Sequence, residues 1–118
     1  MLKNGTDFSK IILVCGRVDL RRGIDGLAAH VRLNYDLDPY EKGTLYLFCG
    51  RRAGRIKALA FEGIGMTLYI MRLSGDNRFQ WPRKTNEAVE ITREQHQNLM
   101  GGFPLTGTIK ESHVSKSA

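Results

Sequence analysis

The sequence is poor in cysteine, and this excludes two classes of protein. Among its 118 residues the only thiols are Cys15 and Cys49, and they form no CxxC pair. Two thiols are far below the density of a disulfide-stapled fold and too few for a cysteine-ligated structural zinc site. Each ends a strand-like run and precedes Gly-Arg, so we expect two buried, reduced thiols at strand ends. A disulfide between them remains open as an alternative.

Long apolar runs are also absent. Uninterrupted runs such as residues 11–15 are far shorter than the ~20 residues that cross a membrane. Lys3, Asn4, Asp7 and Ser9 interrupt the place where a signal peptide would have its apolar core. A length of 118 residues with 42% apolar and 25% charged side chains is typical of one globular domain. Together these features predict a cytoplasmic protein without a membrane partner.

Motifs of catalysis and cofactor binding are missing as well. The sequence has no glycine-rich phosphate loop, and its three histidines (His30, His96 and His113) lack metal-ligand spacing. The carboxylates have structural interpretations, as a helix cap, a helix ion pair and turn residues: Asp19, Asp25, Asp36, Asp38, Glu62 and Asp76. We therefore expect no enzyme, no cofactor and no metal. A small metal-dependent nuclease, in which such carboxylates would converge on a divalent ion, is the least favoured alternative.

Positive charge is concentrated in the middle of the chain. The net charge of +6 comes from 18 Lys and Arg against 12 Asp and Glu. Residues 44–84 hold eight basic side chains against two acidic ones, so this segment carries the whole excess. Six of the eight are arginines, which pair with phosphate in bidentate geometry and stack on bases. The pattern indicates a nucleic-acid footprint; the alternative is a basic protein whose charges spread around the fold.

An amphipathic helix is predicted in the first third of the chain. Its apolar stripe recurs at helical spacing and consists of Leu20, Ile24, Leu27, Ala28 and Val31. Asp19 is placed to cap the first turn, and Arg21 and Asp25 are placed to pair on the outer side. Gly23 and Gly26 fall inside this helix, which is tolerable if the helix packs closely on a sheet.

Most of the remaining chain is strand-like. A first strand is expected at residues 11–15, and the later ones at 44–49, 55–61, 66–73, 88–91 and, as a short segment closed by Pro82, 78–81. The connections 50–54 and 62–65 are short and Gly-rich, so the three strands that they join should form an antiparallel meander. Thr92 and Gln95 have capping-box spacing and open a short helix through Met100.

These elements predict one α+β domain. The first strand and the helix would pack on an antiparallel meander of four to five strands, with a short C-terminal helix. The domain would span residues 11–103, after an N-terminal arm (1–10) and before a polar tail (104–118) that we expect to be disordered.

A basic hairpin is the first candidate contact with nucleic acid. Arg51 and Arg52 fall at the expected tip, and Arg55 and Lys57 share one face of the following strand because side chains alternate. Such a tip can reach phosphates. The alternative is a charged loop and a strand edge kept soluble by its charges.

The second candidate interleaves basic residues with aromatics. It contains Arg78, Phe79, Trp81, Arg83 and Lys84. Aromatic rings among cations can stack on bases. A lone tryptophan more often packs inward, and we expect Phe79 and Trp81 to do so.

The run DLRRGIDGLA at residues 19–28 carries a family resemblance. It is similar to the D-M-R-K-G/S-x-D-G-L-A signature of the small Orf2 (TnpB) accessory proteins of insertion-sequence-66-type bacterial transposons. The similarity continues over residues 11–102 in the same order and spacing, through LYLF, RR, RIKAL, GIG, RL and RFQWP. The sequence departs from the family pattern at two places. Gly54 replaces an Asp or Asn, and Phe61-Glu62 replaces Trp-Asp or Tyr-Asp.

The resemblance implies an element-encoded protein that assists transposition, while a separate, longer protein carries the acidic strand-transfer triad. It supplies no residue roles for the small protein. Our leading hypothesis is a non-enzymatic accessory factor that binds DNA, at the transposon ends, or a transposase–DNA complex. The basic contacts would be Arg51, Arg52, Arg55 and Lys57, followed by Arg78, Arg83 and Lys84. The alternative is an adaptor that docks on the transposase without touching DNA.

Overall fold

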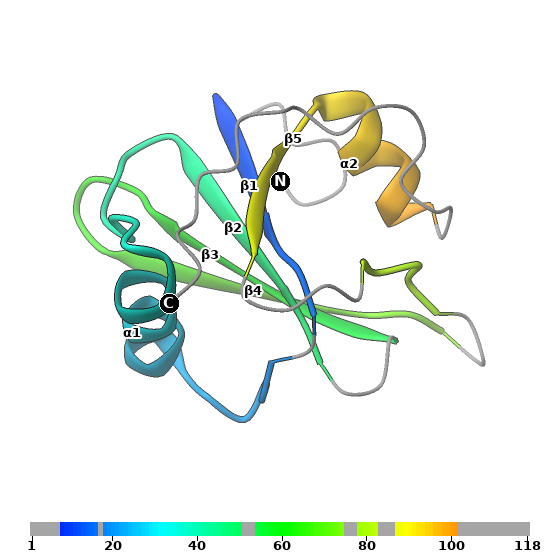
Figure 1. Ribbon diagram of the computed structural model, residues 1–118, viewed down its shortest axis with the longest axis horizontal. Coiled ribbons are helices and arrows are strands. Elements are labelled where there is room, and N and C mark those ends of the chain that lie inside the picture. Colours follow the sequence, from blue (N-terminus) through cyan, green and yellow to red (C-terminus); the bar gives the residue numbers. More distant parts are fainter. Residues whose placement is uncertain (1–7, 17, 51–53, 75–77, 83–86, 102–118) are drawn as a thin grey trace.

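A five-stranded sheet lies between two helices in the computed structural model, which describes residues 8–16, 18–50, 54–74, 78–82 and 87–101 (Figure 1). The elements in chain order are β1 (Lys10–Val14), α1 (Ile24–Tyr35), β2 (Thr44–Cys49), β3 (Arg55–Phe61), β4 (Met66–Arg72), β5 (Ala88–Ile91) and α2 (Arg93–Met100). The strands are arranged in the order β4-β3-β2-β1-β5. No helix among these described residues is long and apolar enough to cross a membrane.

The sheet is mixed. β2, β3 and β4 form the predicted antiparallel meander, and β5 pairs antiparallel with β1. β1, however, runs parallel to β2, because the chain crosses over through α1 between the two strands. The α+β class is thus confirmed, and the departure from a wholly antiparallel sheet follows from that helical crossover.

Each face of the sheet is covered by one helix. On the face toward α1, here called the α1 face, Val31 and Leu27 pack with Tyr46, Phe48 and Leu59. The opposite α2 face is covered by α2, which buries Leu99 there, and by the segment 78–82, which buries Phe79 and Trp81 there. Every residue of β2 is buried, as expected for a strand covered on both faces.

The predicted short strand at residues 78–81 does not form. This segment has no regular secondary structure. Phe79 and Trp81 are nevertheless buried, as predicted, and the Trp81 Nε1–H donates to the Val14 carbonyl oxygen at 2.9 Å. The Gly16 N–H also donates to the Pro82 carbonyl at 2.8 Å. Side-chain burial and contacts with the end of β1 therefore hold the segment, in place of strand pairing.

Helix α1 starts later than the sequence predicted. Its N-cap is Gly23, so Asp19 does not cap the helix. Asp19 Oδ1 instead accepts hydrogen bonds at 3.0 Å from both the backbone N–H and Nε of Arg21. Arg21 consequently pairs with Asp19 and not with Asp25. The delay has a tertiary cause, because the Val18 N–H donates to the Cys49 carbonyl at 2.8 Å and ties this part of the chain to the end of β2.

The glycines of this region do not serve a close approach of helix to sheet. Gly23 lies outside the helix, and a Cβ on it would meet nothing within 4 Å. A Cβ on Gly26 would lie 3.0 Å from the Arg22 Cβ, so Gly26 makes room for the Arg22 side chain. The predicted helix–sheet contact is wrong at both positions. It is Gly50, at the end of β2, that lies against Leu20, whose Cδ1 would be 2.9 Å from an added Cβ.

The C-terminal helix and the cysteines agree with the predictions. The Thr92 side chain accepts from the Gln95 N–H at 3.0 Å, and Gln95 Oε1 accepts from the Thr92 N–H at 2.9 Å, which completes the capping box. Cys15 and Cys49 are buried at or next to strand ends, and neither forms a disulfide. The expected tail (104–118) and residues 1–7 of the expected arm lie outside the described residues.

Candidate nucleic-acid interface

Three of the seven predicted contact residues are described, and four are not. Arg55 and Lys57 lie on β3, and Arg78 follows β4. Arg51, Arg52, Arg83 and Lys84 lie outside the described residues, so they stay predictions from the sequence.

Arg55 stands directly opposite Arg72 in the pairing of β3 with β4. Beyond this pair the Leu73 N–H donates to the Gly54 carbonyl at 2.8 Å. Antiparallel pairs alternate, so Arg55 and Arg72 form a non-hydrogen-bonded pair, in which the two Cα atoms approach to about 4.5 Å. Like charges opposite each other at this spacing destabilise a sheet. Both side chains are exposed.

Lys57 shares the face of Arg55, as predicted, and it connects the sheet to the segment before α1. Leu59, two residues on, is buried against α1, which places Lys57 and Arg55 on the α1 face. Lys57 Nζ donates to the Arg22 carbonyl oxygen at 3.2 Å. This hydrogen bond therefore holds Arg22 beside the basic part of β3, although the two are distant in sequence.

The Arg22 guanidinium folds back over α1. Its NH1 lies 3.2 Å from the Nδ1 atom of His30, which sits on the helix two turns later. Burial, and then the charge of Arg22, lower the pKa of His30, so its ring is neutral at pH 7 and Nδ1 can accept from Arg22. This contact fixes the direction of Arg22 without neutralising its charge.

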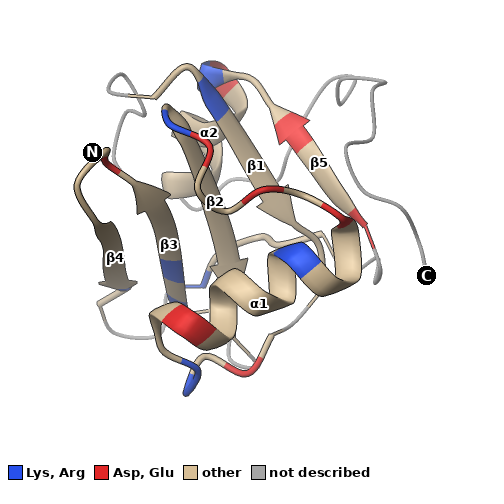
Figure 2. Cartoon of the chain, turned by 90° about the vertical axis from the view of Figure 1, so that its left-hand side faces the viewer, with Lys and Arg blue, Asp and Glu red and all other residues tan. Residues whose placement is uncertain are grey.

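We call the group formed by Arg22, Arg55, Lys57 and Arg72 the basic end of the sheet. Within the described part of the chain, no carboxylate forms an ion pair with any of the four. Arg21 differs, because hydrogen bonds from its side chain and backbone lower the pKa of Asp19 to about 2 and its charge is matched there. Figure 2 shows blue segments of β3, β4 and the chain before α1 at the same end of the molecule.

The basic end has the chemistry of a phosphate-binding surface. Guanidinium groups donate paired hydrogen bonds to phosphate oxygens, and the lysine adds a compact charge. Helix α1 begins beside them at Gly23, whose cap position has no side-chain hydrogen bond, so the positive end of the helix dipole adds to the same field. Phosphate contacts of this kind position a protein on DNA without reading its sequence.

The second predicted segment does not join this group. Phe79 and Trp81 are buried on the α2 face, whereas the basic end lies on the α1 face. Stacking of bases on these two rings is therefore not supported. Arg78 is exposed, but no contact in the described part of the chain links it to Arg55 or Arg72.

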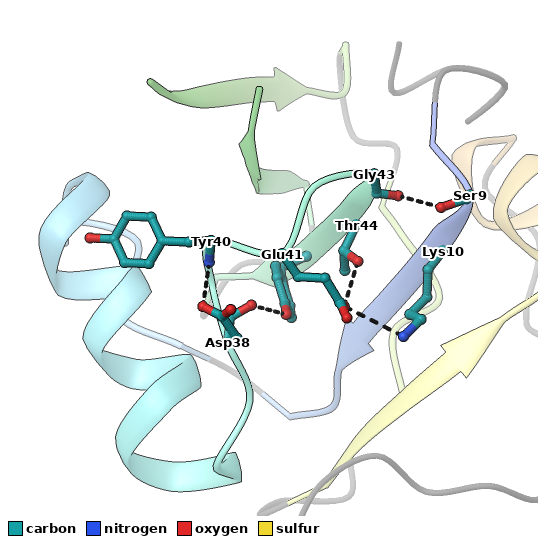
Figure 3. Close-up of polar contacts among 8 residues, drawn as sticks. Ser9, Lys10, Asp38, Tyr40, Glu41, Gly43 and Thr44 are labelled. Atoms are coloured by element: carbon teal, nitrogen blue, oxygen red, sulfur yellow. Dashed lines mark hydrogen bonds and ion pairs between the residues drawn. The ribbon is translucent and has the colours of Figure 1, made fainter. Parts of the chain in front are cut away.

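The acidic residues near the opposite end of β2 are used in a structured loop (Figure 3). Asp38 Oδ1 accepts from the Tyr40 N–H at 2.9 Å, which confirms its role as a turn residue. Glu41 Oε1 accepts from the Thr44 hydroxyl at 2.8 Å and pairs with the Lys10 ammonium at 3.4 Å. No cluster of three or more His, Cys, Asp or Glu able to hold a metal ion occurs among the residues that the structure describes.

Apolar side chains are exposed beside that loop. Tyr40 is 48% exposed and contacts Phe61 edge to face at 5.6 Å between ring centroids. Ile64, in the turn between β3 and β4, is fully exposed. These three residues, here called the apolar tip, lie near the end of β3 opposite to Arg55.

Sequence reasoning missed Arg22 and Arg72 as site residues. Arg72 could have been found, because a four-residue turn at 62–65 sets a register that puts it opposite Arg55. Arg22 gave no such signal, since only the packing of the crossover brings it to Lys57.

Comparison with known proteins identifies relatives over most of the chain. A family model described as IS66 Orf2 like protein matches residues 9–109. Two curated proteins of Sinorhizobium fredii, both named as uncharacterized, are similar. One, y4hO, is 31% identical over 87% of this chain and 87% of its own. The other, y4jC, is 30% identical over 82% of this chain and 81% of its own. No solved structure matches significantly.

Proposed function

Because the chain belongs to the IS66 Orf2-like family of transposon accessory proteins, we propose that it assists transposition by binding DNA through the basic end of its sheet. The DNA would be that of the transposon ends, alone or in complex with the transposase. The contacts would be made to phosphates and would position the protein, and the chain itself would catalyse no step. The site of action would be the bacterial cytoplasm.

The opposed arginines are the observation that carries this proposal. Arg55 and Arg72 repel each other across the β3–β4 pair, and within the described residues no carboxylate relieves the repulsion. A bound phosphate would supply the missing negative charge to both. The two arginines therefore destabilise the free protein, and a bound phosphate would relieve this destabilisation.

We expect duplex DNA to bind with a steep dependence on salt. Binding would be measured by fluorescence anisotropy on a duplex with the element's terminal repeat and on a scrambled duplex, each over a salt series. Replacing Arg55 and Arg72 together with glutamine should lower affinity about tenfold and flatten the slope of log K against log salt by roughly one unit for each lost contact. Unchanged affinity and slope in this variant would contradict the assignment of the basic end.

A pair of variants at Gly23 provides the matched control. A side chain fits at this position, and its extended backbone suits an N-cap asparagine or aspartate. Both Gly23→Asn and Gly23→Asp should therefore fold as well as the wild type. Only Gly23→Asp adds a carboxylate beside the basic end, so only this variant should lose affinity for DNA. Equal loss in both would point to a steric effect and not to charge.

An adaptor function is the second candidate, and the apolar tip favours it. Exposed Tyr40 and Ile64 could dock on the transposase without any contribution from the basic end. A pull-down with the transposase would then survive nuclease treatment and high salt, and Ile64→Ser would abolish it. The adaptor function would be excluded if the wild type bound DNA and Ile64→Ser had no effect on the complex with the transposase.

A further inference from the structure

β4 lies at one border of the sheet, and no other strand among the described residues pairs with its outer edge. Its seven residues, MTLYIMR, contain neither proline nor lysine, and they pair with β3 continuously, without a bulge. Prolines, charges and bulges are the usual means by which edge strands avoid pairing with another chain. Here the only charge is Arg72 at the strand end, and Ile70 is 63% exposed. The edge is therefore both long and apolar.

The outward-pointing backbone groups of β4 are fixed by its pairing with β3. The Leu73 N–H bonds to Gly54 and the Glu62 N–H bonds to Gly65, and alternation between these bonds turns every second residue of β4 toward β3. The N–H and C=O groups on the outer edge belong to Met66, Leu68, Ile70 and Arg72. No backbone hydrogen bond from these groups to another segment occurs within the described residues.

The chemistry of this edge points to a second copy of the chain as the partner, because an antiparallel self-pairing brings Ile70 to Leu68 and brings the basic end of each strand toward the turn that contains Glu62. We propose that two copies pair antiparallel through their β4 edges, with the two Tyr69 residues opposite each other. Leu68 then faces Ile70 of the second copy, and Met66 faces its Arg72. Every outward N–H and C=O of the strand gains a partner, and the α1 faces of both sheets become continuous.

Side-chain chemistry is favourable in this register. The exposed Ile70 is covered by an apolar side chain, Leu68, on the α1 face. Arg72 faces Met66 and lies next to the turn that contains Glu62, so opposite charges approach at both ends of the interface. A shift that centred the axis on Arg72 would instead place the two copies of this arginine opposite each other.

Oligomeric state tests the proposal. Sedimentation equilibrium over a range of protein concentrations should give twice the chain mass for the wild type. Ile70→Lys puts an edge-protecting charge into the interface and should weaken dimerisation about tenfold or more, while it costs the exposed monomer position little. Leu33→Lys makes the same kind of change on the outer face of α1, where Leu33 is 75% exposed, and should leave the dimer intact. A monomeric wild type, or an Ile70→Lys variant that dimerises normally, would overturn the proposal.

Cysteine cross-linking tests the register independently. Tyr69→Cys places two thiols opposite each other on the proposed axis, within the range of a disulfide, and should yield an oxidised dimer. Thr67→Cys lies on the same face, but in this register it meets Met71 of the second copy and not another cysteine. Efficient cross-linking at position 67 instead of 69 would refute the register. Cys15 and Cys49 are buried, so they provide no competing exposed thiol.

Discussion

Replacing Trp81 with alanine is expected to lower the free energy of unfolding by about 3 to 5 kcal/mol. Trp81 is only 5% exposed, and its side chain fills the α2 face although its backbone belongs to no strand or helix. The substitution leaves a large cavity and also removes the hydrogen bond to the Val14 carbonyl. A domain of this size has a total stability of roughly 5 to 15 kcal/mol, so much of the protein would unfold at modest denaturant concentration. Urea denaturation followed by circular dichroism measures the change.

Two further variants separate the causes of that loss. Trp81→Phe keeps most of the apolar area but leaves the Val14 carbonyl without its donor, and it should cost about 1 to 3 kcal/mol. Gln80→Ala changes the exposed neighbour and should stay within about 0.5 kcal/mol of the wild type. If Trp81→Ala behaved like Gln80→Ala, the indole would not be part of the core in solution.

The stability of the protein should fall as the pH is lowered from about 6.5 to 4, and His96 should cause a large part of the fall. His96 is fully buried on α2, and neither ring nitrogen has a hydrogen-bond partner among the described residues. Burial lowers the pKa of His96 to about 4. Between pH 6.5 and 4 the unfolded chain binds a proton that the folded protein does not, so the free energy of unfolding drops by roughly 3 kcal/mol. Below pH 4 this contribution stays constant.

Comparison with His96→Leu isolates the effect. Leucine has no nitrogens to desolvate, so this variant should equal or exceed the wild type at pH 7 and should lack the histidine contribution at low pH. The difference in unfolding free energy between the two proteins, measured at several pH values, should widen as the pH falls. Gln97→Ala, at the exposed neighbouring position, should keep the wild-type profile. A constant difference between pH 7 and 4 would show that His96 is solvated or bonded in the folded state.

The local elements were predictable because their signals lie within a few residues. β2, β3 and β5 have the predicted bounds, and the capping box of α2 forms as its spacing indicates. Short Gly-containing turns determined the meander and, with it, the pairing of neighbouring strands. The start of α1 was not predictable in this way, since a contact between Val18 and the end of β2 overrides the capping preference of Asp19.

The residues of the candidate site also differ in whether a local pattern predicts their positions. Residues on one strand or one hairpin, such as Arg55, Lys57 and Arg72, are brought together by side-chain alternation and register, which a local pattern contains. The inward packing of Trp81 also followed from its residue type. Arg22 joins the site only through the crossover that makes β1 parallel to β2.

By itself the sequence determined the family, the concentration of positive charge in residues 44–84 and most of the secondary structure. These properties depend on residue type and short-range spacing. Only the tertiary structure decided which cations share a face, that Phe79 and Trp81 lie on the opposite face, and that no other strand among the described residues pairs with the outer edge of β4. Those properties depend on strand order and on the packing of distant segments, which bring together residues that no local pattern connects.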